Sequence, residues 1–315
     1  MMRKVIKRTV LSLSMILVIL TVLSLPSYVL LPQDDNVDKN NYTIVIPYRI
    51  DGRNTSGSER NIQDIYLFKL VSHRGYSAEA PENTLPAFRL SKKKGYNYVE
   101  TDIQFTKDGV AVCLHDKFIN RTARYKDGNK IKKIVSINEI TYQQALKYDF
   151  GLWKSEEYKN TQIPTFEQFI KLCRDLDLCP YIELKANAYY TDAQMKYIAD
   201  IVSAYDMDNK VTFICFSYYY LKKIGSLCST SRLGLLYNKK IPLSYGSLLE
   251  LKTEKNEVFI DSRLDCANEI ADTCRNYNIP LEVWVLDTEK SFDELDPYIS
   301  GGTTNRLRII YENGA

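Results

Sequence analysis

From Leu67 onward, short runs of β-branched and aromatic residues alternate with longer amphipathic runs. The short runs are typical of buried strands and the longer ones of helices, so the alternation predicts βα units around a parallel sheet. Eight strand candidates within about 250 residues match the size of a TIM (β/α)8 barrel. Strands are expected at 68–72, 98–102, 180–185, 211–216, 232–237, 258–261, 281–286 and 302–305, and helices at 84–94, 165–175, 192–206, 267–277 and 290–298.

Residues 10–31 form an uncharged apolar run about as long as a bilayer-spanning helix needs. The basic residues ahead of this run predict that the N-terminus lies inside the cell. A cleaved signal peptide is the alternative, because Pro26 is able to break the helix, although no good small-residue cleavage site follows. The basic residues in question are Arg3, Lys4, Lys7 and Arg8.

Four segments are therefore expected along the chain. They are a cytoplasmic basic segment at 1–9, a transmembrane anchor or signal peptide at 10–31, a spacer at 32–66 and the barrel domain at 67–315. One short strand is expected inside the spacer, at 42–47. This order predicts a single-pass protein of the cell membrane with its catalytic domain outside, or a secreted protein if the N-terminal segment is cleaved.

The charge balance argues against nucleic acid as a partner. Without the four N-terminal cations, the 42 basic residues fall to 38, against 39 acidic ones, which is a net charge of −1. A protein that binds a phosphate backbone carries a basic excess, and the body of this chain has none.

The chain contains only two histidines, and both lie in polar motifs. His73 opens a His-Arg-Gly sequence directly after the first barrel strand, and His115 is followed by Asp116. Imidazole is the side chain best able to exchange a proton near neutral pH. The two histidines are therefore candidates for an acid/base pair.

Carboxylates recur at the ends of predicted strands. Glu100 and Asp102 are two residues apart, so their side chains point to the same face of the second strand. Glu183 and Lys185 have the same spacing at the end of the third strand. Because the C-terminal ends of barrel strands line one mouth, these groups and His73 are expected to lie together in a metal-assisted site.

A β-hairpin is expected to return His115 to this site. The residues 106–109 read Thr-Lys-Asp-Gly, a hairpin signal, and no helix separates Asp102 from Val110. A two-residue turn pairs position 102 with 115, and a four-residue loop pairs position 100 with 115. Both registers place His115 beside a carboxylate, whereas a loop with an odd number of residues turns it away.

The motifs taken together resemble those of glycerophosphodiester phosphodiesterases, from about Leu70 to Leu307. The late strand around Trp284 is also similar, but Asp287 stands where an asparagine is usual in that family. Residues 155–160 form a variable insert. The motifs that carry the resemblance are residues 73–75, 81–84, 100–110, 115–116, 120–122, 163–167 and 183–185.

The resemblance implies a TIM barrel with a β-hairpin and loop insertion after the second strand, and one divalent cation at the mouth. It implies that Glu100, Asp102 and Glu183 hold the cation and that His73 and His115 act as the acid/base pair. Three carboxylates suit a hard ion, Ca²⁺ or Mg²⁺.

Arg74 and Lys185 are expected to bind the phosphoryl oxygens of the substrate. Trp284 is expected to line the substrate pocket or to belong to the core. Glu82 is expected behind these groups, supporting them without binding the metal, and Thr84 is expected to cap the following helix.

The expected activity is metal-dependent hydrolysis of glycerophosphodiesters to glycerol 3-phosphate and an alcohol, with His73 as the base and His115 as the acid. Two alternatives remain open. One is an enzyme similar to phospholipases or sphingomyelinase D that acts on membrane lipid. The other is a non-catalytic surface protein that binds phosphodiester groups.

Overall fold

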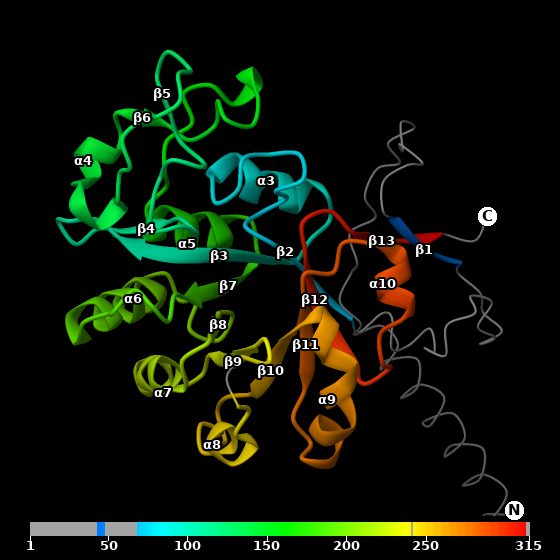
Figure 1. The fold of residues 1–315 in the computed structure, drawn as a ribbon. Coiled ribbons are helices and arrows are strands. Elements are labelled where there is room, and N and C mark those ends of the chain that lie inside the picture. The colour runs from blue at the N-terminus through cyan, green and yellow to red at the C-terminus, as the bar shows by residue number, and fades with distance from the viewer. Residues whose placement is uncertain (1–42, 48–67, 241, 313–315) are drawn as a thin grey trace, which may run out of the picture. The chain divides into compact units, whose positions relative to one another are not determined.

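The computed structural model describes residues 43–47, 68–240 and 242–312, and its main sheet is a closed barrel. Eight parallel strands form the ring, which closes because β2 pairs with β12 on one side and with β3 on the other. Figure 1 shows these strands with helices outside them. The TIM-barrel prediction is thus confirmed. The ring consists of β2 (Lys69–Ser72), β3 (Tyr98–Phe105), β7 (Cys179–Leu184), β8 (Thr212–Cys215), β9 (Arg232–Tyr237), β10 (Val258–Arg263), β11 (Leu281–Trp284) and β12 (Ile299–Thr304).

Helices connect the barrel strands, and Ser or Thr side chains cap most of them. Thr84, for example, accepts a hydrogen bond from the backbone N–H of Ala87, as expected for a helix start. The last helix ends at Asp293, earlier than the expected 298. Pro297 disfavours helical backbone at Asp296, which prevents a helix from continuing to 298. The helices are α3 (Leu85–Lys93), α5 (Phe166–Asp175), α6 (Asp192–Ala204), α7 (Tyr218–Leu227), α8 (Tyr245–Leu249), α9 (Leu264–Asn276) and α10 (Glu289–Asp293).

Alternating residues of each barrel strand face either the helices or the barrel interior. On β10, Val258 and Ile260 pack in the core beneath the helices, whereas Phe259 packs with Tyr181 and Ile214 inside the ring. This period of two is the property of a strand that the sequence pattern relied on. It also places the alternate polar residues at the ends of the strands in the barrel mouth.

An insertion between β3 and α5 carries the second histidine. It has its own small core, which includes Ile119, Ile137 and Phe150. The ammonium group of Lys154 ties it to the loop after β2 by donating to the carbonyl oxygens of Ser77 and Ala78, both at 2.8 Å. The elements of the insertion, gathered beyond the end of β3 in Figure 1, are β4 (Ala111–Cys113), β5 (Arg124–Tyr125), α4 (Tyr142–Ala145), β6 (Tyr148–Asp149) and the 3₁₀ turns Ile137–Glu139 and Glu156–Tyr158.

The hairpin of β3 and β4 forms, but both expected registers are wrong. The backbone of Thr106 bonds to that of Val110, so the loop has three residues, 107–109, with Gly109 at a φ of +79°. In this register Cys113 lies opposite Ile103, and position 115 falls opposite 101. β4 ends at Cys113, before His115, so the alternation of side chains along a strand does not determine where His115 points. The outward orientation expected for a loop with an odd number of residues therefore does not apply.

A second sheet of two parallel strands joins the ends of the barrel unit. β1 (Thr43–Pro47), inside the predicted spacer, pairs with β13 (Arg308–Glu312), for which the sequence indicated no element. The expected transmembrane segment, 10–31, lies outside the described residues. Within the part of the chain that the structure describes, no helix has the length and apolar character needed to cross a bilayer.

Asp261 is an unusual residue of the barrel interior. It follows Phe259 on the inner face of β10, is 1% exposed, and neither carboxyl oxygen has a hydrogen-bond partner among the described residues. Burial, together with the nearby charges of Glu282 and Glu183, raises the pKa of Asp261 well above its ordinary value. A carboxyl group whose pKa is raised in the folded protein destabilises the fold at every pH at which the same group is ionised in the unfolded chain.

We expect Asp261→Asn to stabilise the protein at neutral pH. Because the pKa of Asp261 is raised in the folded state, its ionisation does not lower the free energy of unfolding at pH values below the unfolded pKa of about 4. The free energy of unfolding is lowered progressively more as the pH rises above that value. The gain measured by urea unfolding should exceed about 1 kcal/mol at pH 7 and shrink at pH 5. Asp293→Asn, at an exposed position, is the control. A loss of stability in Asp261→Asn at pH 7 would contradict this account.

Candidate active site

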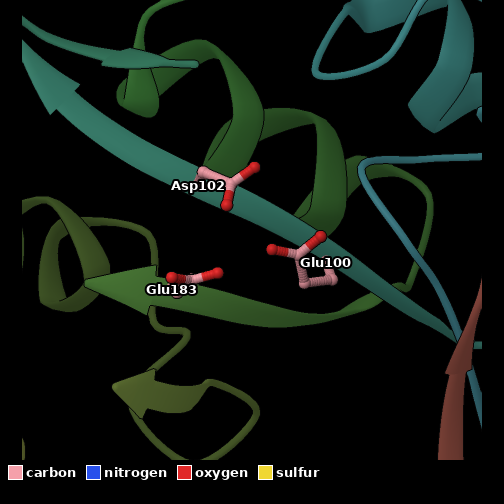
Figure 2. Close-up of side chains that lie close together, drawn as sticks. All are labelled: Glu100, Asp102 and Glu183. Atoms are coloured by element: carbon pink, nitrogen blue, oxygen red, sulfur yellow. The ribbon is translucent and has the colours of Figure 1, made fainter. Parts of the chain in front are cut away.

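Three carboxylates meet at the C-terminal end of the barrel. Glu100 and Asp102 come from β3 and Glu183 from the neighbouring β7, and Figure 2 shows their carboxyl groups turned toward one another. One oxygen atom from each lies within 4.8 Å of the others. Glu100 and Asp102 are buried, and Glu183 is nearly so. The structure thus brings together all three residues that were expected to hold a metal.

Two cationic side chains face this acidic cluster. The Lys185 ammonium lies 2.5 Å from Asp102 Oδ1 and 2.8 Å from Glu183 Oε1. The Arg74 guanidinium Nε lies 3.5 Å from Asp102 Oδ2, and the Arg74 backbone N–H donates to Glu100 Oε2 at 2.8 Å. Both residues expected to bind phosphoryl oxygens therefore lie at the cluster, where they neutralise part of its negative charge.

The pKa values show that this neutralisation is incomplete. Burial raises the pKa of Asp102, but Lys185 and Arg74 outweigh it and hold that pKa well below its ordinary value. Burial and the charge of Asp102 raise the pKa of Glu100 well above its usual range, and burial raises that of Glu183 to about 7. Glu100 Oε1 is buried without a hydrogen-bond partner among the described residues. A hard cation at this point would satisfy that oxygen, so the residues fit a divalent metal.

The backbone at the His-Arg-Gly motif is shaped to deliver Arg74 to the cluster. Arg74 and Gly75 have φ values of +56° and +79°, in the left-handed region. A Cβ atom on Gly75 would lie 2.6 Å from the Cβ of Ala87. Only glycine permits this close approach of the loop to α3, and the turn directs the Arg74 N–H at Glu100.

Asn83 is a site residue that the sequence interpretation missed. It was expected only as part of the motif at 81–84, but its Nδ2 donates to Asp102 Oδ2 at 2.7 Å. Its Oδ1 accepts from Thr101 Oγ1, also at 2.7 Å. Asn83 therefore fixes the orientation of Asp102, and local sequence contains no signal for this contact because the two residues meet only across the barrel mouth.

His73 follows β2 and bonds to the last barrel strand. Its Nδ1 lies 2.8 Å from Asn305 Oδ1. Burial, followed by the charge of Arg74, lowers the pKa of His73 to about 4. The imidazole is thus neutral over the physiological pH range.

His115 has a different partner, the carboxylate of its neighbour. Its Nδ1 lies 2.6 Å from Asp116 Oδ1. Burial lowers the pKa of His115, and the opposing effects of the Asp102 charge and of the hydrogen bond to Asp116 do not offset it. The backbone holds His115 beside β3, because the N–H of Leu114 donates to the carbonyl oxygen of Asp102 at 2.9 Å and Gln104 Nε2 donates to the carbonyl oxygen of His115 at 3.3 Å.

An ionic network links the insertion to the barrel. Glu82 bridges Arg74, at 2.9 Å, and Arg121, at 2.6 and 2.8 Å. Arg121 also donates from Nε to Asp116 Oδ2 at 2.6 Å, and Asp116 in turn holds His115. Glu82 thus lies behind the cluster and contacts Arg74 directly. Arg121 was expected only as part of the motif at 120–122, and its bridging contacts were not predicted from the sequence.

Trp284 lies at the end of β11 and contacts the barrel interior. Its indole N–H donates to the carbonyl oxygen of Asp261 at 3.0 Å, and its ring meets Phe216 edge to face at 5.9 Å. The side chain is half-buried. It therefore packs against the interior cluster while keeping part of its surface exposed.

Residues 73–302, more than half of the chain, match the model of the glycerophosphoryl diester phosphodiesterase family. The chain belongs to this family. Its enzyme class is accordingly that of a phosphoric diester hydrolase, and hydrolysis of glycerophosphodiesters is the activity of the family.

Individual relatives agree with this assignment. The chain is 24% identical over 250 residues to a glycerophosphodiester phosphodiesterase of Caldanaerobacter subterraneus subsp. tengcongensis, which covers 78% of this chain and 98% of the relative. It is 34% identical over 130 residues to mouse glycerophosphodiester phosphodiesterase 1, covering 41% of this chain and 37% of the relative.

Solved structures share the fold. An Oleispira antarctica phosphodiesterase in complex with the product sn-glycerol-3-phosphate has a TM-score of 0.62 and 19% identity, over 76% of this chain and 94% of that chain. A glycerophosphodiester phosphodiesterase of Agrobacterium tumefaciens has a TM-score of 0.59 and 21% identity, over 76% and 96%.

We expect Arg121→Ala to lower turnover without a comparable loss of stability. The change frees Asp116 and Glu82, which position His115 and Arg74, and loss of such supporting contacts typically costs about 10- to 100-fold in activity. The measurement is kcat on a glycerophosphodiester beside a urea unfolding curve. Arg124→Ala removes only contacts to backbone carbonyl oxygens and is the matched control. Equal turnover in the two variants would rule out the supporting role.

Proposed function

We propose that the chain hydrolyses glycerophosphodiesters to glycerol 3-phosphate and an alcohol, using one divalent cation, Ca²⁺ or Mg²⁺, and the two histidines as acid and base. The observation that carries this proposal is the convergence of three carboxylates and two cationic side chains at one barrel mouth. The only two imidazoles of the chain follow β2 and β4, two strands that pair with β3 beside this cluster. A protein that only binds phosphodiesters has no need of two imidazoles that exchange protons.

Glu100, Asp102 and Glu183 would hold the cation. The all-oxygen donor set, the buried free oxygen of Glu100 and the raised pKa values of Glu100 and Glu183 support this assignment. When bound, the cation neutralises charge on the phosphodiester. Arg74 and Lys185 add two further positive charges there, Arg74 with a planar fork that suits phosphoryl oxygens.

The partners of the two histidines support different roles. His73 bonds to a neutral amide and its pKa is about 4, so its ring is unprotonated and able to take a proton from the attacking hydroxyl group. His115 bonds to the Asp116 carboxylate, which favours the imidazolium form more than the neutral amide beside His73 does, although burial still lowers the pKa of His115 overall. We therefore assign His73 as the base and His115 as the acid that protonates the leaving alkoxide.

Release of glycerol 3-phosphate from glycerophosphodiesters tests the activity and the metal together. We expect turnover by the metal-loaded protein, loss of it in chelator, and recovery when Ca²⁺ or Mg²⁺ is restored. Glu183→Gln should weaken metal binding, whereas Glu167→Gln, an exposed position on α5, should not. Full turnover in chelator would remove the cation from the proposal.

Leaving groups of different basicity separate the roles of the two histidines. His73→Ala and His115→Ala should each lower kcat about 100-fold or more on an alkyl alcohol diester, by the usual size of acid/base effects. With a p-nitrophenol leaving group, which departs without protonation, His115→Ala should recover most of the loss and His73→Ala should not. The reverse pattern would exchange the two assignments.

We also propose that residues 10–31 tether the protein to the cell membrane, with the N-terminus inside and the catalytic domain outside. The support is the uncharged apolar run with basic residues before it. Protease added to intact cells should then digest the barrel domain, and the domain should sediment with membranes. Release of the domain into the medium would indicate that the segment is cleaved.

A further inference from the structure

Asp287 accepts three hydrogen bonds beside the loop that contains His73. Its Oδ1 accepts from Thr304 Oγ1 at 2.9 Å and from the Asn305 backbone N–H at 2.7 Å. Its Oδ2 accepts from Asn305 Nδ2 at 2.7 Å. A carboxylate only accepts hydrogen bonds, so the side chain of Asn305 has to present its NH₂ group to Asp287.

The amide of Asn305 then has its oxygen on the opposite side, where His73 lies. Asn305 Oδ1 is 2.8 Å from His73 Nδ1 and also accepts from Ser77 Oγ at 2.9 Å. An amide oxygen has no proton to donate, so a hydrogen bond at this point requires the proton on His73 Nδ1. The lone pair of a neutral ring is then on Nε2.

We infer that Asp287, acting through Asn305, holds His73 in the tautomer that carries its proton on Nδ1. Asp287 and Asn305 are thereby positioning residues, because neither is proposed to touch the substrate. Asp287 is also the position at which this sequence departs from the usual pattern of the family it resembles. The consequence for turnover rests on the proposed role of His73 as the base, whereas the tautomer itself does not.

Both groups that contact Asp287 Oδ1 are hydrogen-bond donors, so this position requires an acceptor atom. Thr304 Oγ1 already accepts from the backbone N–H groups of Arg306 and Leu307, so its own proton is directed at residue 287. The Asn305 backbone N–H is a donor in any case. An asparagine at position 287 must therefore keep its oxygen there and turn its NH₂ toward the Asn305 side chain.

In Asp287→Asn, Asn305 is expected to flip its amide, because two NH₂ groups do not bond to each other. Its NH₂ then faces His73 Nδ1, which has to accept, and the proton moves to Nε2. The double variant Asp287→Asn with Asn305→Asp restores the original order: the amide donates to the new carboxylate, which accepts from His73 Nδ1–H. Ser77→Ala removes a contact to Asn305 without touching Asp287 and is the matched control.

The test is long-range ¹H–¹⁵N NMR of the full chain labelled in histidine, which reports the protonated ring nitrogen directly. Only two histidines contribute, and a His115→Gln sample assigns them. We expect Nδ1–H for His73 in the wild type, in Ser77→Ala and in the double variant, and Nε2–H in Asp287→Asn. Turnover should fall about 100-fold in Asp287→Asn and return to within about tenfold of wild type in the double variant.

Nε2–H in the wild type would overturn the inference without any variant, so it stays testable if Asp287→Asn fails to fold. Nδ1–H in a folded Asp287→Asn protein would overturn it equally. A wild type that shows the expected tautomer, and the expected reversal in Asp287→Asn, but hydrolyses no glycerophosphodiester would support the tautomer inference and remove the proposed function. The spectra and the turnover thus report on the two claims separately.

Discussion

Repulsion among Glu100, Asp102 and Glu183 is the constraint on which the rest of the site depends. At an effective dielectric constant of about 20, two unit charges 4.8 Å apart repel by about 3.5 kcal/mol. A typical hydrogen bond contributes only about 1 kcal/mol to stability. Hydrogen bonds alone do not hold three ionised carboxylates together, so the cluster needs positive charge. Lys185 and Arg74 supply two positive charges. The raised pKa values of Glu100 and Glu183 show that part of the repulsion remains.

Two groups of the site are oriented by segments distant from them in the sequence. Asp102 is oriented by Asn83, from the loop before α3. His73 is oriented by Asn305, from the end of the last barrel strand. The barrel strands therefore determine where the functional groups lie, whereas the connecting loops determine how they are turned. This division is characteristic of TIM barrels, in which loops at one end carry the chemistry.

The insertion after β3 contributes more than the second histidine. Arg121 joins Asp116, the partner of His115, to Glu82, the partner of Arg74. The position of His115, the proposed acid, is thus coupled through charged contacts to that of Arg74, which is proposed to bind the phosphoryl group. Lys154 adds two hydrogen bonds from the insertion to the loop after β2, which keep the two sides of this network together.

The order of strands and the positions of the carboxylates were predictable from the sequence, because both follow from local patterns of residues. Short β-branched and aromatic runs located all eight barrel strands, and the spacing of Glu100 and Asp102 placed them on one face. The hairpin register was not predictable, because residues 106–109 are compatible with loops of two, three or four residues. The structure has the loop of three, with Gly109 at a positive φ. Contacts such as those of Asn83 with Asp102 and Asp287 with Asn305 were decided only by the tertiary structure. A hydrogen bond depends on distances of a few tenths of an ångström between segments far apart in the chain, and local side-chain pattern does not encode such distances.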